Sequence, residues 1–286
     1  MNNNLLKELK LKVFQSGNPS FIYIGINVAI FIVVALINVP FFLSGNGGLV
    51  YDDFIREYFG FPATIIQQPI RFYTILTYQF FHDGFFHLLF NMLWLYWMGN
   101  IFLDFLKPRQ FHFVFLTGGF AGAVLFALAF NIFPVFRTVS GATVIGSSAA
   151  VMAIVVATAT LLPNYAIRLF LFGELKLKYL AIAYVILDLI GTTSANAGGS
   201  FAHIGGALLG FTYIKMLQNG NDWSSIFKRK PKLRVVKPDP KTQKNESRKD
   251  YVDQREIDAI LDKISKTGYD KLSREEKETL FKASKH

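Results

Sequence analysis

Cysteine is absent from the 286 residues of the chain. Its absence excludes a disulfide framework, a thiol nucleophile and any metal site built on thiolate ligands. Charged residues are also scarce, at 17% of the chain, whereas soluble domains carry about 25%. The first twenty residues, MNNNLLKELKLKVFQSGNPS, are polar and basic and lack the apolar core of a signal peptide. We therefore expect the first apolar segment to target the chain to a membrane and to stay there.

Apolar residues make up 52% of the chain and gather in long runs. A membrane-spanning helix needs about 20 mostly apolar residues, which six segments supply in full or nearly so. The composition and these runs together predict an all-α membrane protein with a bundle of six transmembrane helices. The six segments begin at Phe21, His87, Phe111, Gly146, Lys178 and Ser200.

The basic residues predict the orientation of this bundle. They gather before the first segment, between the second and third, between the fourth and fifth, and in the tail, whereas the opposite loops hold few. Positive charge marks the cytoplasmic side, so both termini are expected in the cytoplasm and the protein in the cell membrane. The net charge of +10 raises the question of nucleic acid. Because these charges adjoin apolar segments, we expect the lipid bilayer as partner and no nucleic acid.

Four regions follow from these patterns. They are a cytoplasmic N-terminal segment at 1–19, a six-span core at 20–217, a basic flexible linker at 218–250 and a small cytoplasmic helical hairpin at 251–286. The linker is rich in Lys, Pro and Asn, a composition that does not form a packed core.

Helix-capping signals support the hairpin. Asp253 with Glu256, and Ser273 with Glu276, have the spacing of a capping box, in which the first side chain and the fourth cap each other's backbone N–H groups. Gly268 stands where the first helix is expected to end. No feature of the hairpin indicates its partner.

Polar residues stand at the start of the second, fourth and sixth apolar segments. They are His87, Asn91, Ser148 and His203. These three segments are predicted to cross the membrane in the same direction, so their first turns lie at one depth, near the outer face. Polar side chains inside a membrane are costly and usually functional. Small residues on the fourth and sixth segments allow close helix contact, which a short serine side chain needs to reach an imidazole.

These residue types suit acyl transfer. A serine hydroxyl is a weak nucleophile unless a base takes its proton, and His203 is the candidate base for Ser148. His87 and Asn91, with the backbone N–H of Ser148, are candidate donors to an oxyanion. Ser147 is the better candidate for an ordinary helix cap.

The stretches HDGFFHLLFN, GSSA and AHIGGALLG, in this order, resemble the motifs of the rhomboid intramembrane serine proteases. The resemblance covers about residues 20–217, and the tail hairpin resembles an extension found on some bacterial members. It implies an endopeptidase with a Ser148–His203 dyad, no catalytic acid, and His87 and Asn91 at the oxyanion. It also implies that the substrates are transmembrane protein segments cut near the outer face, with no metal or cofactor.

The chain departs from the rhomboid pattern at two positions. Ala149 follows the serine where the family often has glycine, and Met152 stands where many members have a tyrosine packed against the histidine. One alternative is therefore a catalytically inactive rhomboid-like protein that binds membrane clients. The presence of both dyad residues argues against it.

A second alternative is a proton-coupled transporter in which His203, Asp188 and His87 relay protons. The absence of a visible internal repeat argues against this function. Asp188 itself is expected either to extend to the outer interface or to orient a residue of the site. His82 is expected to be an interfacial residue rather than a catalytic one.

Overall fold

The computed structural model describes residues 17–45, 54–139, 141–169, 173–227 and 254–284. The chain divides into two compact units, Met1–Arg229 and Lys230–His286. Several predicted features lie outside the described residues: the N-terminal segment up to residue 16, the linker from residue 228 and the capping residue Asp253.

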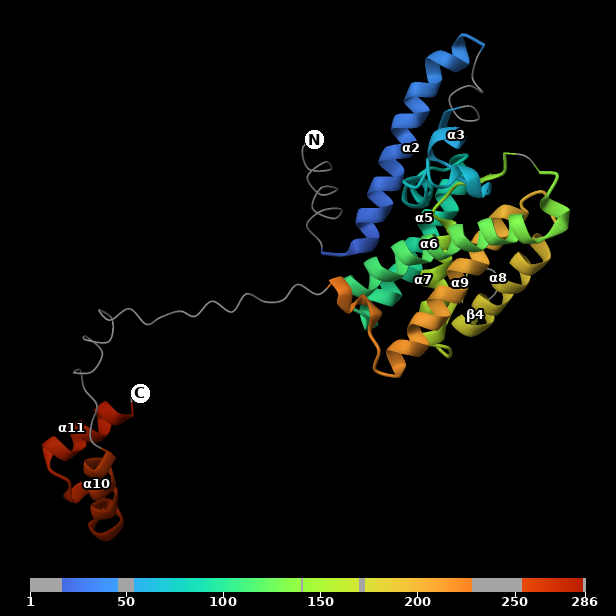
Figure 1. Ribbon diagram of the computed structural model, residues 1–286. Helices are drawn as coiled ribbons and strands as arrows, with labels where there is room; N and C mark the ends of the chain where they lie inside the picture. Colours follow the sequence, from blue (N-terminus) through green and yellow to red (C-terminus); the bar gives the residue numbers. More distant parts are fainter. Residues whose placement is uncertain (1–16, 46–53, 140, 170–172, 228–253, 285–286) are drawn as a thin grey trace. The chain divides into compact units, whose positions relative to one another are not determined.

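Each apolar segment predicted from the sequence corresponds to one helix of the first unit (Figure 1). The helices are α2 (Pro19–Leu43), α5 (Phe85–Phe105), α6 (Pro108–Ile132), α7 (Ser148–Leu161), α8 (Leu177–Gly191) and α9 (Ala197–Gln218). Among the described residues, α2, α5 and α6 are long and apolar enough to cross a membrane, and α7 is a shorter apolar helix. Helices suit this environment because each satisfies its own backbone hydrogen bonds.

The loops between these helices contain short elements. The loop before α5 and the loop before α7 are joined by a two-stranded antiparallel pair in which Phe61 faces Val144. A second antiparallel pair lies between α7 and α8 and places Ala166 opposite Lys176. The short elements of this unit are α3 (Arg56–Phe59), β1 (Phe61–Pro62), η3 (Ile65–Gln67), α4 (Thr74–Thr77), η4 (Tyr78–Phe80), η5 (Pro134–Phe136), β2 (Thr143–Val144), β3 (Ala166–Leu169), β4 (Gly173–Lys176) and η6 (Trp223–Phe227).

Small residues bring α6, α7 and α9 into close contact at the centre of the bundle. A Cβ on Gly206 or Gly210 of α9 would overlap the carbonyl oxygens of Ala149 and Ala153 of α7. Every residue from Ala149 to Ala159 is buried. The helix that carries Ser148 therefore packs closely against the backbone of α9, and Gly118 and Gly122 of α6 face the Cβ atoms of Ala153 and Ala149 on its other side. This confirms the small-residue packing predicted from the sequence.

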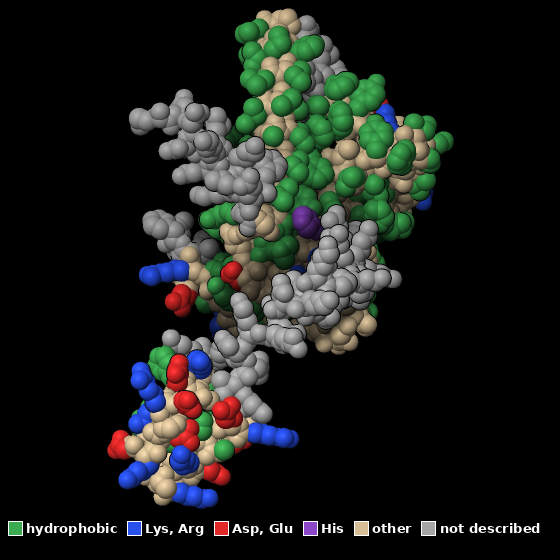
Figure 2. Space-filling view, turned by 90° about the vertical axis from the view of Figure 1, so that its left-hand side faces the viewer, with side chains coloured by type: hydrophobic (Ala, Val, Ile, Leu, Met, Phe, Trp, Pro, Cys, Tyr) green, Lys and Arg blue, Asp and Glu red, His purple; other side chains and the backbone are tan. Residues whose placement is uncertain are grey.

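Apolar side chains cover much of the outer surface of the first unit (Figure 2). Exposed apolar area of this extent is rare on soluble monomers and is typical of a surface that faces lipid. On α8 the exposed residues include Ile182, Ile186, Leu187, Leu189 and Ile190. The fold is thus that of a helical membrane bundle.

The second unit consists of α10 (Gln254–Thr267), η7 (Tyr269–Lys271) and α11 (Arg274–Ala283). The predicted capping box at α11 is confirmed, because the Ser273 hydroxyl accepts from the Glu276 N–H and the Glu276 carboxylate accepts from the Ser273 N–H. Gly268 directly follows α10 with a φ of 84°, as expected for a glycine that ends a helix. Charged side chains of both signs cover this unit (Figure 2).

Candidate active site

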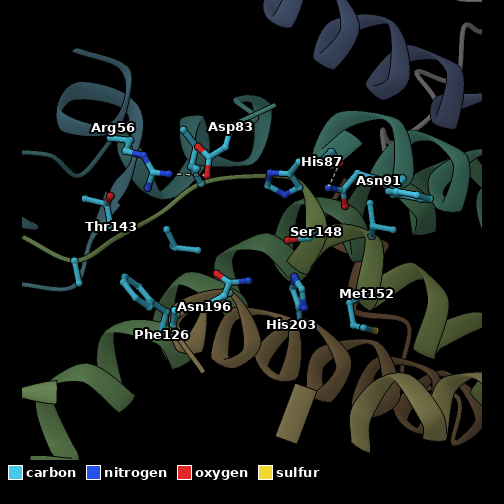
Figure 3. A pocket seen from close by; sticks show the side chains of 18 of the residues that line it. Arg56, Asp83, His87, Asn91, Phe126, Thr143, Ser148, Met152, Asn196 and His203 are labelled. Carbon is cyan, nitrogen blue, oxygen red and sulfur yellow. Dashed lines mark hydrogen bonds and ion pairs between the residues drawn. The ribbon is translucent and has the colours of Figure 1, made fainter. Parts of the chain in front are cut away.

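A cavity of about 1110 Å³ lies among α5, α7, α8 and α9. His87, Asn91, Ser148 and His203 all line it. In Figure 3, Ser148 lies between His87 and His203, and the His203 ring points toward it. The structure thus brings together the four side chains that the sequence placed at one depth.

Gly146 makes room for His87 beside Ser148. Its φ of 122° lies in a region that side-chain-bearing residues rarely adopt. A Cβ at this position would lie 2.8 Å from Cε1 of His87 and 3.8 Å from Oγ of Ser148. The glycine of the GSSA stretch therefore allows the imidazole and the hydroxyl to approach the same point.

Asn91 is one helical turn beyond His87 and is largely buried. Its side-chain Nδ2 donates a hydrogen bond to the backbone carbonyl of His87 at 2.8 Å. This bond anchors the amide to its own helix, at the wall of the cavity. An amide in this place can donate its second N–H toward a ligand in the cavity.

Ser147 and His82 form a pair that corrects two predictions. Ser147 is the N-cap residue of α7, but its hydroxyl makes no capping bond and lies 3.1 Å from Nε2 of His82. His82 is 1% exposed, so it is a buried residue and not an interfacial one. Burial, together with the nearby His87, lowers the pKa of His82 to about 3, so its ring is neutral at neutral pH. The pair ties the loop before α5 to the start of α7.

His203 on α9 forms a hydrogen bond with Asp188 on α8, and Nδ1 and Oδ1 are 2.8 Å apart. The Asp188 side chain is 13% exposed and turned inward, so it does not extend to the outer interface. Ser148 and His203 are both among the described residues, and no hydrogen bond joins them in this structure. Catalytic hydrogen bonds are often long before substrate binds, so the absence of this bond is compatible with Ser148 as nucleophile and His203 as its base.

Ala149 and Met152, the two residues that depart from the rhomboid pattern, are both buried. The Ala149 side chain is buried against Gly122 of α6, where a Cβ would lie 2.5 Å from that of Ala149. The extra methyl group is thus accommodated by a glycine on the facing helix. Met152, one turn after Ser148, lines the same cavity and is 5% exposed.

An ion pair lies at the wall of the cavity on the loop side. Arg56 and Asp83 are 2.7 Å apart, and both line the cavity (Figure 3). Their side chains are each 37% exposed, so the cavity opens at the protein surface here. In the part of the chain that the structure describes, no group of three His, Asp or Glu side chains is arranged to hold a metal ion.

Two family models match the chain. The model of the Rhomboid domain matches residues 69–219, and a family of unknown function, DUF6576, matches residues 242–286. No curated protein shows a significant match. The Rhomboid match spans more than half of the chain and includes the helices that carry the cavity. The apolar helices and this match make the chain a multi-pass membrane protein. Rhomboids are generally intramembrane serine proteases, and this chain belongs to the rhomboid family.

Proposed function

We propose that this protein is an active serine endopeptidase that cleaves transmembrane segments of membrane proteins near the outer face. The observation that carries the proposal is the shared cavity of Ser148, His203, His87 and Asn91. A nucleophile, a base and two hydrogen-bond donors are the groups that acyl transfer requires.

In the proposed reaction, the Ser148 hydroxyl attacks the carbonyl carbon of the scissile peptide. Its proton passes to Nε2 of His203, and the carbonyl oxygen becomes an oxyanion. His87, Asn91 and the backbone N–H of Ser148 donate hydrogen bonds to that oxyanion. His203 then protonates the leaving amine, and an attacking water completes hydrolysis of the acyl-enzyme with the same base.

The length of α7 supports a site inside the membrane. Its 14 residues span about 21 Å, less than the roughly 30 Å of the hydrocarbon core. A helix of this length cannot reach both faces, so Ser148 at its start lies below the surface if its other end reaches the cytoplasmic side. The polar wall formed by Arg56 and Asp83 offers a route for the water that hydrolysis needs.

The proposal includes six membrane crossings, both termini in the cytoplasm and a location in the cell membrane. The substrate has to present an extended backbone, because a helix engages its carbonyl groups in internal hydrogen bonds. A transmembrane segment with helix-destabilising residues in its outer third fits this requirement.

Reconstituted vesicles test the function. The full chain is inserted with tagged single-span peptides that carry either Gly and Pro or only Leu in the outer third. Mass spectrometry then identifies the products from wild type and Ser148→Ala. We expect the Gly- and Pro-containing peptide to be cut in its outer third by wild type alone. Equal cleavage by Ser148→Ala contradicts the mechanism, and peptide binding without cleavage favours an inactive rhomboid-like protein.

A further inference from the structure

We propose that Asp188 is a positioning residue for His203, so that this chain uses a Ser148–His203–Asp188 triad. The inference rests on the proposed function and deepens it, because the resemblance to rhomboids implies a dyad without an acid. It is carried by the bond between Nδ1 of His203 and Oδ1 of Asp188.

The surroundings of Asp188 indicate that its carboxylate serves this histidine. Its second oxygen, Oδ2, is buried and has no hydrogen-bond partner among the described residues. Burying a carboxylate that has one hydrogen bond costs free energy unless that hydrogen bond compensates for the lost contact with water. Tyr184, one turn earlier on α8, lines the cavity, and Asp188 lies behind it against His203, which lines the cavity as well.

His203 depends on that bond for its orientation. Within the described part of the chain, Asp188 is the residue that hydrogen-bonds its ring, and no aromatic ring packs against it. Met152, at the position one turn after Ser148, has a flexible thioether side chain that cannot fix the plane of an imidazole. The Asp188 carboxylate can fix this plane, because it accepts a hydrogen bond from one defined ring atom, Nδ1.

This geometry selects the useful tautomer of the histidine. When Nδ1–H donates to Asp188, the lone pair lies on Nε2, the ring nitrogen that takes the proton of Ser148. After that transfer the ring is an imidazolium beside a carboxylate, which stabilises it. The proton leaves from Nε2 to the amine of the departing peptide, while Nδ1 keeps its hydrogen bond to Asp188.

A structural tie between α8 and α9 is the competing interpretation of the same bond. The two interpretations differ in what Asp188→Asn does to the folded protein. A tie affects the amount of folded protein and its thermal stability. A positioning residue affects the reactivity of Ser148 in molecules that are folded.

The test measures the rate of labelling by a fluorophosphonate, with kcat and KM for the cleaved peptide, in full-length protein. The variants are Asp188→Asn, Asp188→Glu and the control Asp104→Asn, an exposed carboxylate on α5 outside the cavity. We expect Asp188→Asn to lower the labelling rate and kcat by about 10²- to 10⁴-fold with KM unchanged, and Asp188→Glu to restore part of both. We expect Asp104→Asn to match wild type.

The outcomes separate the two proposals. Labelling of wild type together with normal labelling of folded Asp188→Asn overturns the triad and leaves the protease intact. Reduced stability with a normal labelling rate overturns it in the same way, in favour of the tie. Absence of labelling in folded wild type overturns the protease and the triad together.

A second measurement reports the tautomer directly. Nitrogen NMR of the protein with ¹⁵N-labelled histidine, assigned by the signal lost in His203→Gln, shows which ring nitrogen carries the proton. We expect the proton on Nδ1 in wild type and a mixture of tautomers in Asp188→Asn. A wild type with the proton on Nε2 contradicts the triad.

Discussion

Gly122 of α6 faces Ala149 of α7 so closely that a Cβ on the glycine would lie 2.5 Å from that of the alanine. The same Cβ would lie 2.7 Å from the carbonyl oxygen of Ala202 on α9. Three helices therefore meet at a point directly beside Ser148. The bundle has no room for one more carbon atom there.

Gly122→Ala is accordingly expected to destabilise the protein by about 1–3 kcal/mol, because overpacking a dense core forces its helices apart. The measurement is the thermal unfolding midpoint in detergent, with fluorophosphonate labelling as a readout of the site. The control is Gly84→Ala, since nothing lies within 4 Å of a Cβ at Gly84. Equal unfolding midpoints for the two variants would contradict the close contact of Gly122 with Ala149 and Ala202.

The oxyanion donors are expected to contribute separately from the nucleophile. His87→Ala and Asn91→Ala should each leave measurable cleavage, while Ser148→Ala and His203→Ala abolish it. Loss of one oxyanion donor costs about 2.7–4 kcal/mol of transition-state stabilisation, or roughly 10²- to 10³-fold in kcat. The check is kcat for peptide cleavage in each variant. Full activity of both donor variants would remove them from the proposed oxyanion site.

His82 is expected to make the fold sensitive to acid. Its pKa is about 3 in the folded protein, where burial and His87 disfavour the charged ring, against a usual value of 6.5. Between pH 6.5 and 3 the unfolded chain binds a proton that the folded chain does not, so stability falls as pH falls through this range. The slope reaches at most about 1.4 kcal/mol per pH unit.

Thermal unfolding midpoints of wild type and His82→Gln, measured from pH 8 to pH 4, test this contribution of His82 to acid sensitivity. The variant should have a shallower dependence on pH below 6.5, whatever its absolute stability, and the two slopes should agree above pH 7. Parallel curves over the whole range would show that His82 does not titrate in this way.

The tail helices offer a test that is independent of catalysis. Ser273→Ala removes the hydroxyl that accepts from the Glu276 N–H and should destabilise the start of α11 by about 0.5–2 kcal/mol. Hydrogen exchange of the first-turn amides of α11 in the full chain should therefore become faster. Ser265→Ala is the matched control, because that hydroxyl bonds only a carbonyl within α10. Similar exchange in both variants would argue against the cap.

The hydropathy of the chain and the alternating direction of successive helices predicted much of the bundle and of the site. The helices form where apolar runs are long enough, and alternate helices run in the same direction. This is why the sequence alone predicts His87, Ser148 and His203 at one depth. The close contacts also followed from side-chain size, since glycine and alanine are the residues that let backbones meet.

The interactions that sequence reasoning missed depend on the rotation of helices and the packing of loops. Asp188 and His203 lie on consecutive helices, and only the rotation of α8 decides whether the carboxylate faces lipid or the histidine. His82 and Ser147 are brought together by loops that the β1–β2 pair holds side by side. The polar character of Asp188 in an apolar segment was the available signal, and it left both orientations open.

Ser148, activated as a nucleophile by His203, is the centre of the proposed function. The most direct measurement is to treat the full-length protein with a fluorophosphonate and to map the modified residue by mass spectrometry in wild type and His203→Ala. We predict a single adduct on Ser148 in wild type and none in the variant, shown to be folded by its unfolding midpoint. An unmodified wild type, or an adduct that forms equally without His203, would contradict the proposed protease.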